Sequence, residues 1–135
     1  MTNEFAERYM SVWNEADPET RRELVAALWT EDAVVLLDPP QVVRETAADL
    51  GVTPVLEVRG HDALDHRVTR AHDAFVAPGE VYFAVRTPAV RLGDVVTFSW
   101  SVIRTGDGAA VGGGLEVCEM AADGRISKGY QFIDR

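Results

Sequence analysis

The chain is poor in cationic residues, with 13 Lys or Arg against 22 Asp or Glu among its 135 residues, and its formal net charge is −9. The cations are scattered along the chain. Proteins that bind nucleic acid gather Lys and Arg on one surface to contact phosphates, and an acidic surface disfavours anionic membranes. The sequence therefore predicts neither a nucleic acid partner nor a membrane partner.

Cysteine is also scarce. The single Cys118 excludes an internal disulfide and fits a reducing compartment. The first ten residues, MTNEFAERYM, are charged and contain no apolar stretch of the kind that a secretion signal requires. No apolar run approaches the roughly 20 residues that a membrane-spanning helix needs. We therefore expect a cytoplasmic protein.

Apolar residues make up 47% of the chain, which is typical of a globular protein. A chain of this length buries roughly two-thirds of its unfolded surface. Neither repeats nor low-complexity linkers divide the sequence. It therefore predicts one domain that covers residues 1–135.

The first half of the chain has mainly helical periodicity. Phe5, Tyr9, Val12 and Trp13 predict a first helix over residues 3–15, and Pro18 favours the start of a second over residues 18–29. A short buried strand follows at 33–37. Further helices are expected at 41–50 and 60–75, with an extended segment at 55–58 between them.

From residue 81 the hydrophobic period changes to two, which indicates strands at 81–86, 89–92, 95–104, 112–121 and 125–134. Helices followed by an antiparallel meander predict an α+β fold. A long curved sheet needs a covered concave face, and the preceding helices are available to cover it. The expected shape is a cone with a pocket between helices and sheet.

Three side chains with acid or base chemistry occur where a pocket is expected: Tyr9, Asp38 and Glu116. Glu116 alternates with apolar residues and so can face inward, where desolvation would raise the pKa of its carboxyl. It can also be a surface acid paired with an Arg. Asp38 can act as a base at a pocket mouth or cap the helix that follows it. Tyr9 can donate from its hydroxyl or serve as a core residue.

Five stretches resemble the nuclear-transport-factor-2-like (NTF2-like) superfamily. They are residues 9–17 (YMSVWNEAD), 26–33 (AALWTEDA), 38–39 (DP), 60–64 (GHDAL) and 123–126 (DGRI). The resemblance covers nearly the whole chain and implies a cone-shaped α+β barrel, a curved antiparallel sheet wrapped around the N-terminal helices. It is specific for the fold and unspecific for activity, because the superfamily includes isomerases, dehydratases, cyclases, epoxide hydrolases and binding proteins.

Within that superfamily, the front half resembles ketosteroid isomerase, and the pattern is equally close to the SnoaL-like polyketide cyclases. The resemblance to ketosteroid isomerase implies that Asp38 is the general base and that Tyr9 and Glu116 form the oxyanion hole. Glu replaces that family's Asp at position 116. Residues 40–58 form an insertion, which we expect to be a lid or an extra pocket wall.

The favoured function is cofactor-free acid/base catalysis on a hydrophobic, carbonyl-bearing small molecule, by isomerisation or ring closure. The alternatives are a non-catalytic ligand-binding protein and a dehydratase or epoxide hydrolase. Small hydroxyl side chains on one face of the 95–104 strand indicate either a homodimer interface or a solvent-exposed face. No metal is expected, because the His residues lack a third ligand. Residues expected to bind the substrate are Trp13, Phe75, Trp100 and Tyr130, together with His72.

Overall fold

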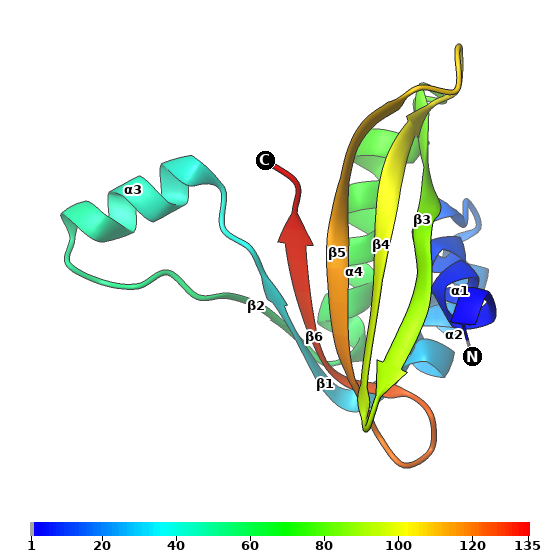
Figure 1. Cartoon of the computed structure of the whole chain (residues 1–135), viewed down its shortest axis with the longest axis horizontal. Coiled ribbons are helices and arrows are strands. Elements are labelled where there is room, and N and C mark those ends of the chain that lie inside the picture. The colour runs from blue at the N-terminus through cyan, green and yellow to red at the C-terminus, as the bar shows by residue number, and fades with distance from the viewer. Residues whose placement is uncertain (1) are drawn as a thin grey trace.

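The computed structural model describes the backbone of residues 2–135 and the side chains of residues 4–135. Its helices precede most of its strands (Figure 1). The elements are α1 (Thr2–Asn14), α2 (Pro18–Leu28), β1 (Trp29–Leu37), α3 (Gln41–Asp49), β2 (Leu56–Arg59), α4 (His61–Ala71), the π-helical turn η1 (His72–Val76), β3 (Val81–Leu92), β4 (Val95–Arg104), β5 (Ala110–Met120) and β6 (Ile126–Ile133).

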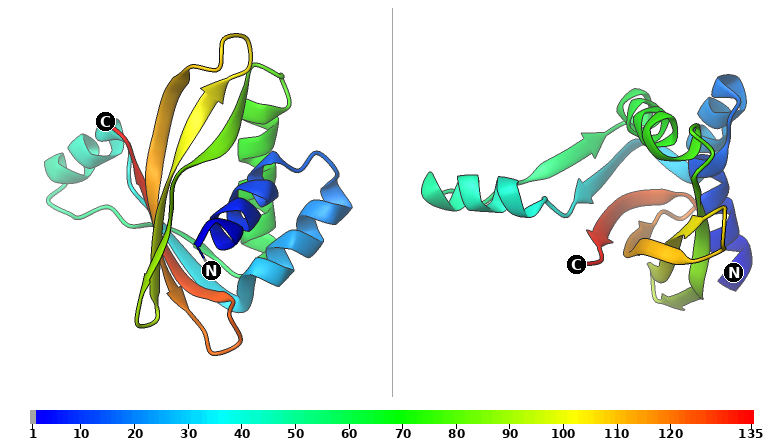
Figure 2. Two further views of the ribbon diagram at one scale, coloured as in Figure 1. Left: turned by 45° about the vertical axis from the view of Figure 1, so that its right-hand side comes forward. Right: turned by 90° about the horizontal axis from the view of Figure 1, so that it is seen from above.

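The six strands form one curved, unclosed sheet in the order β2-β1-β6-β5-β4-β3. The neighbours β3 to β6 pair antiparallel, as the meander predicts, whereas β1 lies parallel to β6. The helices α1 and α4 lie across one face of the sheet (Figures 1 and 2). The predicted α+β cone is confirmed.

Local chemistry explains where two of the helices begin. Asp17 caps α2, since its carboxylate accepts from the backbone N–H of Thr20 at 2.9 Å, and Pro18 is the first helical residue. Gly60 precedes α4 with a φ of 84°, a conformation that other residues rarely adopt. The single helix predicted over 60–75 is α4 followed by the wider turn η1.

The structure corrects the prediction at two strands. The two strands predicted at 81–86 and 89–92 are one, β3, which contains Pro88 and has register shifts near Thr87. Proline lacks an N–H donor, and it is tolerated here because β3 is the edge strand of the sheet. Strand β1 begins at Trp29, four residues before the predicted start at 33, because the chain turns into the sheet directly after α2.

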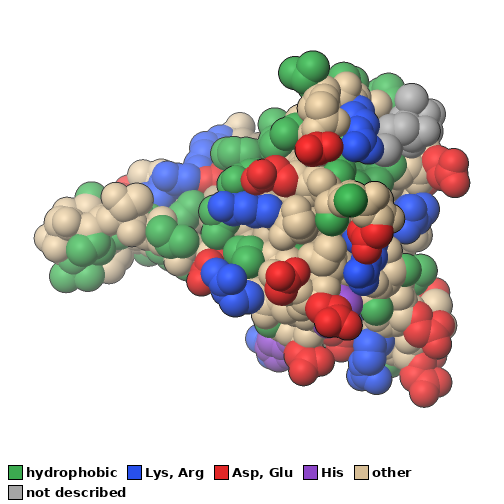
Figure 3. Space-filling model, turned by 90° about the horizontal axis from the view of Figure 1, so that it is seen from below, with side chains coloured by type: hydrophobic (Ala, Val, Ile, Leu, Met, Phe, Trp, Pro, Cys, Tyr) green, Lys and Arg blue, Asp and Glu red, His purple; other side chains and the backbone are tan. Residues whose placement is uncertain are grey.

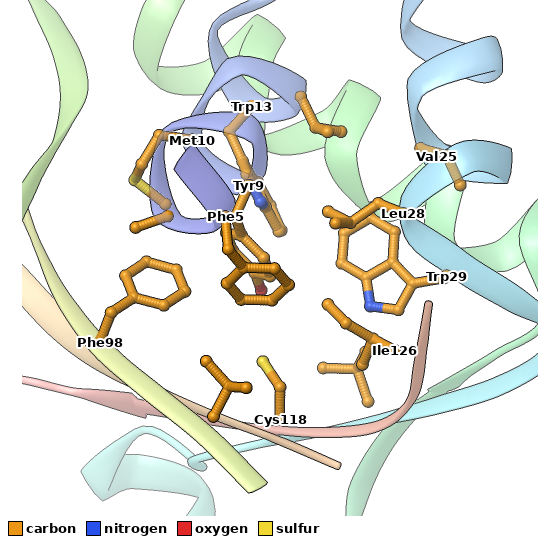
Figure 4. Close-up of a cluster of buried hydrophobic side chains, with 14 of the residues drawn as sticks. Phe5, Tyr9, Met10, Trp13, Val25, Leu28, Trp29, Phe98, Cys118 and Ile126 are labelled. Atoms are coloured by element: carbon orange, nitrogen blue, oxygen red, sulfur yellow. The ribbon is translucent and has the colours of Figure 1, made fainter. Parts of the chain in front are cut away.

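The core lies between α1 and the concave face of the sheet. Figure 4 shows Phe5 and Tyr9 of α1 lying between Phe98 of β4 and Trp29 of β1. The Tyr9 ring contacts Phe98 with a centroid separation of 5.1 Å and Trp29 with one of 5.5 Å, both edge-on. Edge-to-face pairs of this kind stabilise by about 1 kcal/mol beyond the area that they bury. This packing fixes the direction of the Tyr9 side chain.

Residues 39–55, here named the α3 arm, project from the body of the protein (Figures 1–3). The cavity described below has no lining residue from the arm, so the prediction that residues 40–58 form a lid or pocket wall is wrong for this conformation. Several large apolar side chains of the arm are exposed instead, among them Val42 by 67%, Leu50 by 73% and Val55 by 67%. No helix within residues 2–135 combines the length and the apolar character that crossing a membrane demands.

Candidate functional site

A cavity of about 590 Å³ lies between the helices and the concave face of the sheet. This volume is in the range of small-molecule sites. Apolar side chains from α1, η1 and the strands form most of its wall, among them Met10, Trp13, Phe75, Phe83 and Trp100. Four buried or half-buried polar side chains line it as well, Tyr9, Arg67, Glu116 and Gln131, and the exposed Asp134 completes the lining. The cavity is therefore lined mainly by apolar side chains, with one small group of polar side chains among them.

Glu116 is the most buried of the four, with 1% of its surface exposed. Its Oε1 accepts hydrogen bonds from Gln131 Nε2 at 2.7 Å and Trp100 Nε1 at 3.1 Å, whereas Oε2 has no partner among the described residues. Burial raises the pKa of this carboxyl to about 8, against the lowering effect of Gln131, Tyr9 and Trp100. At neutral pH Glu116 is therefore mainly a neutral acid.

The proton of Glu116 can be assigned to one oxygen. The guanidinium of Arg67 can only donate, and its Nη2 lies 3.1 Å from the side-chain oxygen of Gln131. The amide oxygen of Gln131 therefore faces Arg67, and its NH₂ faces Glu116 Oε1. Since Oε1 accepts from both Gln131 and Trp100, the proton belongs on Oε2. The structure thus has a buried carboxylic O–H beside the cavity, with no hydrogen-bond partner among the described residues.

Local sequence explains why Glu116 points inward. Along β5, Glu116, Cys118 and Met120 are buried on one face, and Leu115 is exposed on the other. The sequence allowed an inward Glu116 or a surface acid paired with an Arg, and the structure shows the inward orientation. Gly114 is opposite Trp100 in the sheet, and a Cβ there would lie 2.6 Å from the indole. Because Gly114 has no side chain, the Trp100 ring can occupy this space, and from there its indole N–H donates to Glu116.

Tyr9 comes from α1 and lies one helical turn before Trp13. It is 2% exposed, and burial, followed by the nearby charge of Glu116, raises the pKa of its phenol well above the ordinary value. The hydroxyl therefore keeps its proton and can donate. The structure places Tyr9 and Glu116 close enough for each to shift the pKa of the other.

Sequence reasoning missed Arg67 and Gln131. Arg67 of α4 lies over the Trp13 ring at 5.7 Å, and burial lowers the pKa of its guanidinium. Its position three residues after Leu64 and one before Val68, both buried, is the only signal in the sequence. Gln131 is buried because β6 alternates, and its partner in the sheet is Glu116.

The structure separates Asp38 from the other two acid/base candidates. Asp38 does not line the cavity. Its carboxylate accepts from Arg44 Nη2, from Arg135 Nη2 at 2.8 Å and from the backbone N–H of Ile133 at 3.3 Å. Burial raises the pKa of this group, but these partners outweigh burial and lower it below the ordinary value. Asp38 connects the base of the α3 arm to the C-terminal residues.

The predicted substrate-binding residues are divided between the cavity and other parts of the fold. Trp13, Phe75 and Trp100 line the cavity. Tyr130 does not, because it alternates with Gln131 along β6; its hydroxyl donates to Glu119 Oε2 at 2.8 Å. His72 is buried outside the cavity lining, with Nδ1 3.1 Å from the carbonyl oxygen of Trp13.

No group of three His, Cys, Asp or Glu side chains within the described residues is placed to hold a metal ion. The His61 ring lies against the main chain instead, with Nε2 2.7 Å from the carbonyl oxygen of Trp29. The polar side chains of the cavity are hydrogen-bond donors and a neutral acid. They can bind and polarise an oxygen of a small organic molecule.

Comparison with family models gives no match, and neither does comparison with curated proteins. Solved structures do match. An isomerase candidate of the SnoaL-like family from Agrobacterium tumefaciens is 26% identical, with a TM-score of 0.75 over 98% of this chain and 96% of that one. An NTF2-like protein of unknown function from Exiguobacterium is 18% identical, with a TM-score of 0.65 over 96% and 98% of the two chains. A polyketide cyclase candidate from Sinorhizobium meliloti is 14% identical, with a TM-score of 0.57 over 95% and 93%.

Proposed function

We propose that this chain, which belongs to the NTF2-like superfamily with the SnoaL-like proteins, is an enzyme that isomerises or cyclises a hydrophobic carbonyl compound by acid catalysis. The observation that supports this most is the buried carboxyl of Glu116 at the wall of an apolar cavity, with its pKa raised to about 8 and its Oε2 without a partner among the described residues. A carboxylic acid with a pKa near the working pH is well suited to donate to an oxygen that gains negative charge.

In this proposal the carbonyl oxygen of the substrate lies against Glu116 and Tyr9. Both groups keep their protons at neutral pH, and both can donate to the oxygen. Glu116 transfers its proton to the carbonyl oxygen. The carboxylate that remains accepts the proton that the neighbouring carbon of the substrate loses, so that an enol forms and Glu116 regains its proton. The indole of Trp100 and the amide of Gln131 hold the carboxyl in place through Oε1. The mainly apolar wall lowers the local dielectric constant, which strengthens each hydrogen bond to the substrate oxygen.

Asp38 has a different role in this proposal. Its three donors already occupy the carboxylate, and its position outside the cavity lining supports a structural function. The reaction is therefore assigned to Glu116, with Tyr9 as the second donor.

Assay of the wild type, Glu116→Gln and Asp38→Asn against a panel of enones and polyketide-like ketones tests this assignment. We expect Glu116→Gln to lower kcat/KM by about 10²- to 10⁴-fold, the usual contribution of a positioned acid, and Asp38→Asn to change it by less than about fivefold. The wild-type rate should fall as pH rises through about 8, where Glu116 loses its proton.

A large loss in Asp38→Asn with little loss in Glu116→Gln would overturn the assignment and restore Asp38 as the base. Binding of panel compounds by the wild type without any turnover would support the alternative, a ligand-binding protein that does not catalyse a reaction.

We also propose a homodimer through the outer face of the sheet. Leu115 and Phe132 pair across β5 and β6 on that face and are 39% and 49% exposed. The neighbouring Ser99 is buried, because the side chains of Arg86 and Thr87 contact its hydroxyl, so this part of the outer face is not open to solvent.

Light scattering after size exclusion should give twice the monomer mass for the wild type and the monomer mass for Phe132→Glu. Leu92→Glu, at an exposed hairpin, is the control and should remain dimeric. A monomeric wild type would contradict the proposal.

A further inference from the structure

The cavity contains a cation that no described acid pairs with. Arg67 lines the cavity and is absent from the ion pairs within the described residues. Arginine has five N–H donors; one of those on Nη2 donates to Gln131, and Nε is buried without a partner in the described part of the chain. The ring of Trp13 supplies the remaining favourable contact. The guanidinium thus has unused donors at the cavity.

The other ionisable groups of the cavity do not compensate this charge. Glu116 and Tyr9 are neutral at pH 7 because burial raises the pKa of each. Asp134, which also lines the cavity, is paired with Arg86 at 2.6 Å and is partly exposed. The interior of the cavity therefore has a net positive charge in a protein whose overall charge is −9.

We propose that the ligand of this cavity is a hydrophobic carboxylate whose carboxylate group pairs with Arg67. A planar guanidinium matches a carboxylate with two parallel hydrogen bonds. The interaction is stronger in a partly buried, mainly apolar site than at the surface. The apolar side chains that line the cavity then contact the hydrophobic part of the ligand. The proposal rests on the function proposed above and specifies its substrate: a keto acid, with its carbonyl at Glu116 and its carboxylate at Arg67.

The same geometry makes binding sensitive to pH. When Glu116 ionises, its negative charge lies near Arg67 and competes with the ligand. The other titratable groups that face Glu116 are Tyr9 from α1 and Cys118 from its own strand, and both remain neutral because burial raises their pKa. Affinity for a carboxylate should therefore fall above pH 8, and the fall should be absent in Glu116→Gln.

Calorimetric titration with two probes of similar size tests the proposal. The probes are 2-naphthoate, which has a carboxylate, and 2-acetylnaphthalene, which is a neutral ketone. At pH 7 we expect the wild type to bind 2-naphthoate at least tenfold more tightly. Arg67→Met should abolish this preference. Arg70→Met, which removes an exposed cation from the same helix, should retain it.

Arg67→Lys keeps the positive charge but lacks the planar guanidinium, so it should retain part of the preference for 2-naphthoate. It serves as a second variant if Arg67→Met fails to fold. Equal binding of the two probes by the wild type, binding of neither, or an unchanged preference in the Arg67 variants would overturn the proposal. Probe binding needs no turnover, so these outcomes are separate from those of the catalytic assay.

Discussion

Glu116→Gln should be more stable than the wild type at alkaline pH, by on the order of 4 kcal/mol at pH 9. The carboxyl has a pKa of about 8 in the folded protein and an ordinary value of 4.5. Between these values the folded chain binds a proton that the unfolded chain has released. Stability therefore decreases as pH rises through this window, by up to about 1.4 kcal/mol per pH unit, and levels off above pH 8. A glutamine has the same shape and no such dependence.

Urea unfolding of both proteins at intervals from pH 5 to pH 9 measures this difference. Glu119→Gln removes the same charge from the outer face of the same strand, and so controls for the change in net charge. If the difference in unfolding free energy between wild type and Glu116→Gln is the same at pH 5 and pH 9, Glu116 is not held neutral by the fold. The acid role proposed for Glu116 would then lose its basis.

Strand periodicity is a local property, and it placed Glu116 on one of the two faces of the 112–121 segment. The residues that alternate with Glu116, among them Leu115 and Val117, are apolar too, so periodicity alone allowed either face to be the buried one, and the structure shows that it is the face of Glu116. The start of α2 at Asp17 and Pro18 is equally local, since one side chain caps the helix and the next residue cannot donate. Where a few neighbouring residues determine the structure, the sequence was sufficient.

The partners of Asp38 and Arg67 could not be predicted in this way. Asp38 contacts Arg135, 97 residues further along the chain, and that contact decides that its carboxylate is occupied. Arg67 is expected from composition to face solvent, because charged side chains are seldom buried. Its position depends on where Trp13 and Gln131 lie in space.

Gly114→Ala should lower the free energy of unfolding by about 3 kcal/mol or more, the upper end of what an added group in a packed site costs. A Cβ at this position would lie 2.4 Å from the carbonyl oxygen of Phe132 and 2.6 Å from the Trp100 ring. The first contact is with backbone, so relief requires β5 and β6 to move apart. The second would shift the indole that donates to Glu116.

Gly112→Ala is the matched control, because it lies on the same strand and its Cβ would meet Val102 at an ordinary 3.6 Å. An alanine there reduces the freedom of the unfolded chain, so we expect a change within about 1 kcal/mol, in the stabilising direction. Urea unfolding measures both variants, and a change in near-ultraviolet circular dichroism, to which Trp100 contributes together with Trp13 and Trp29, reports on movement of the indole. Equal stability of the two variants would contradict the close approach of Gly114 to β6 and Trp100. A large loss at Gly114 alone would establish that the glycine makes the space in which Trp100 holds the buried acid.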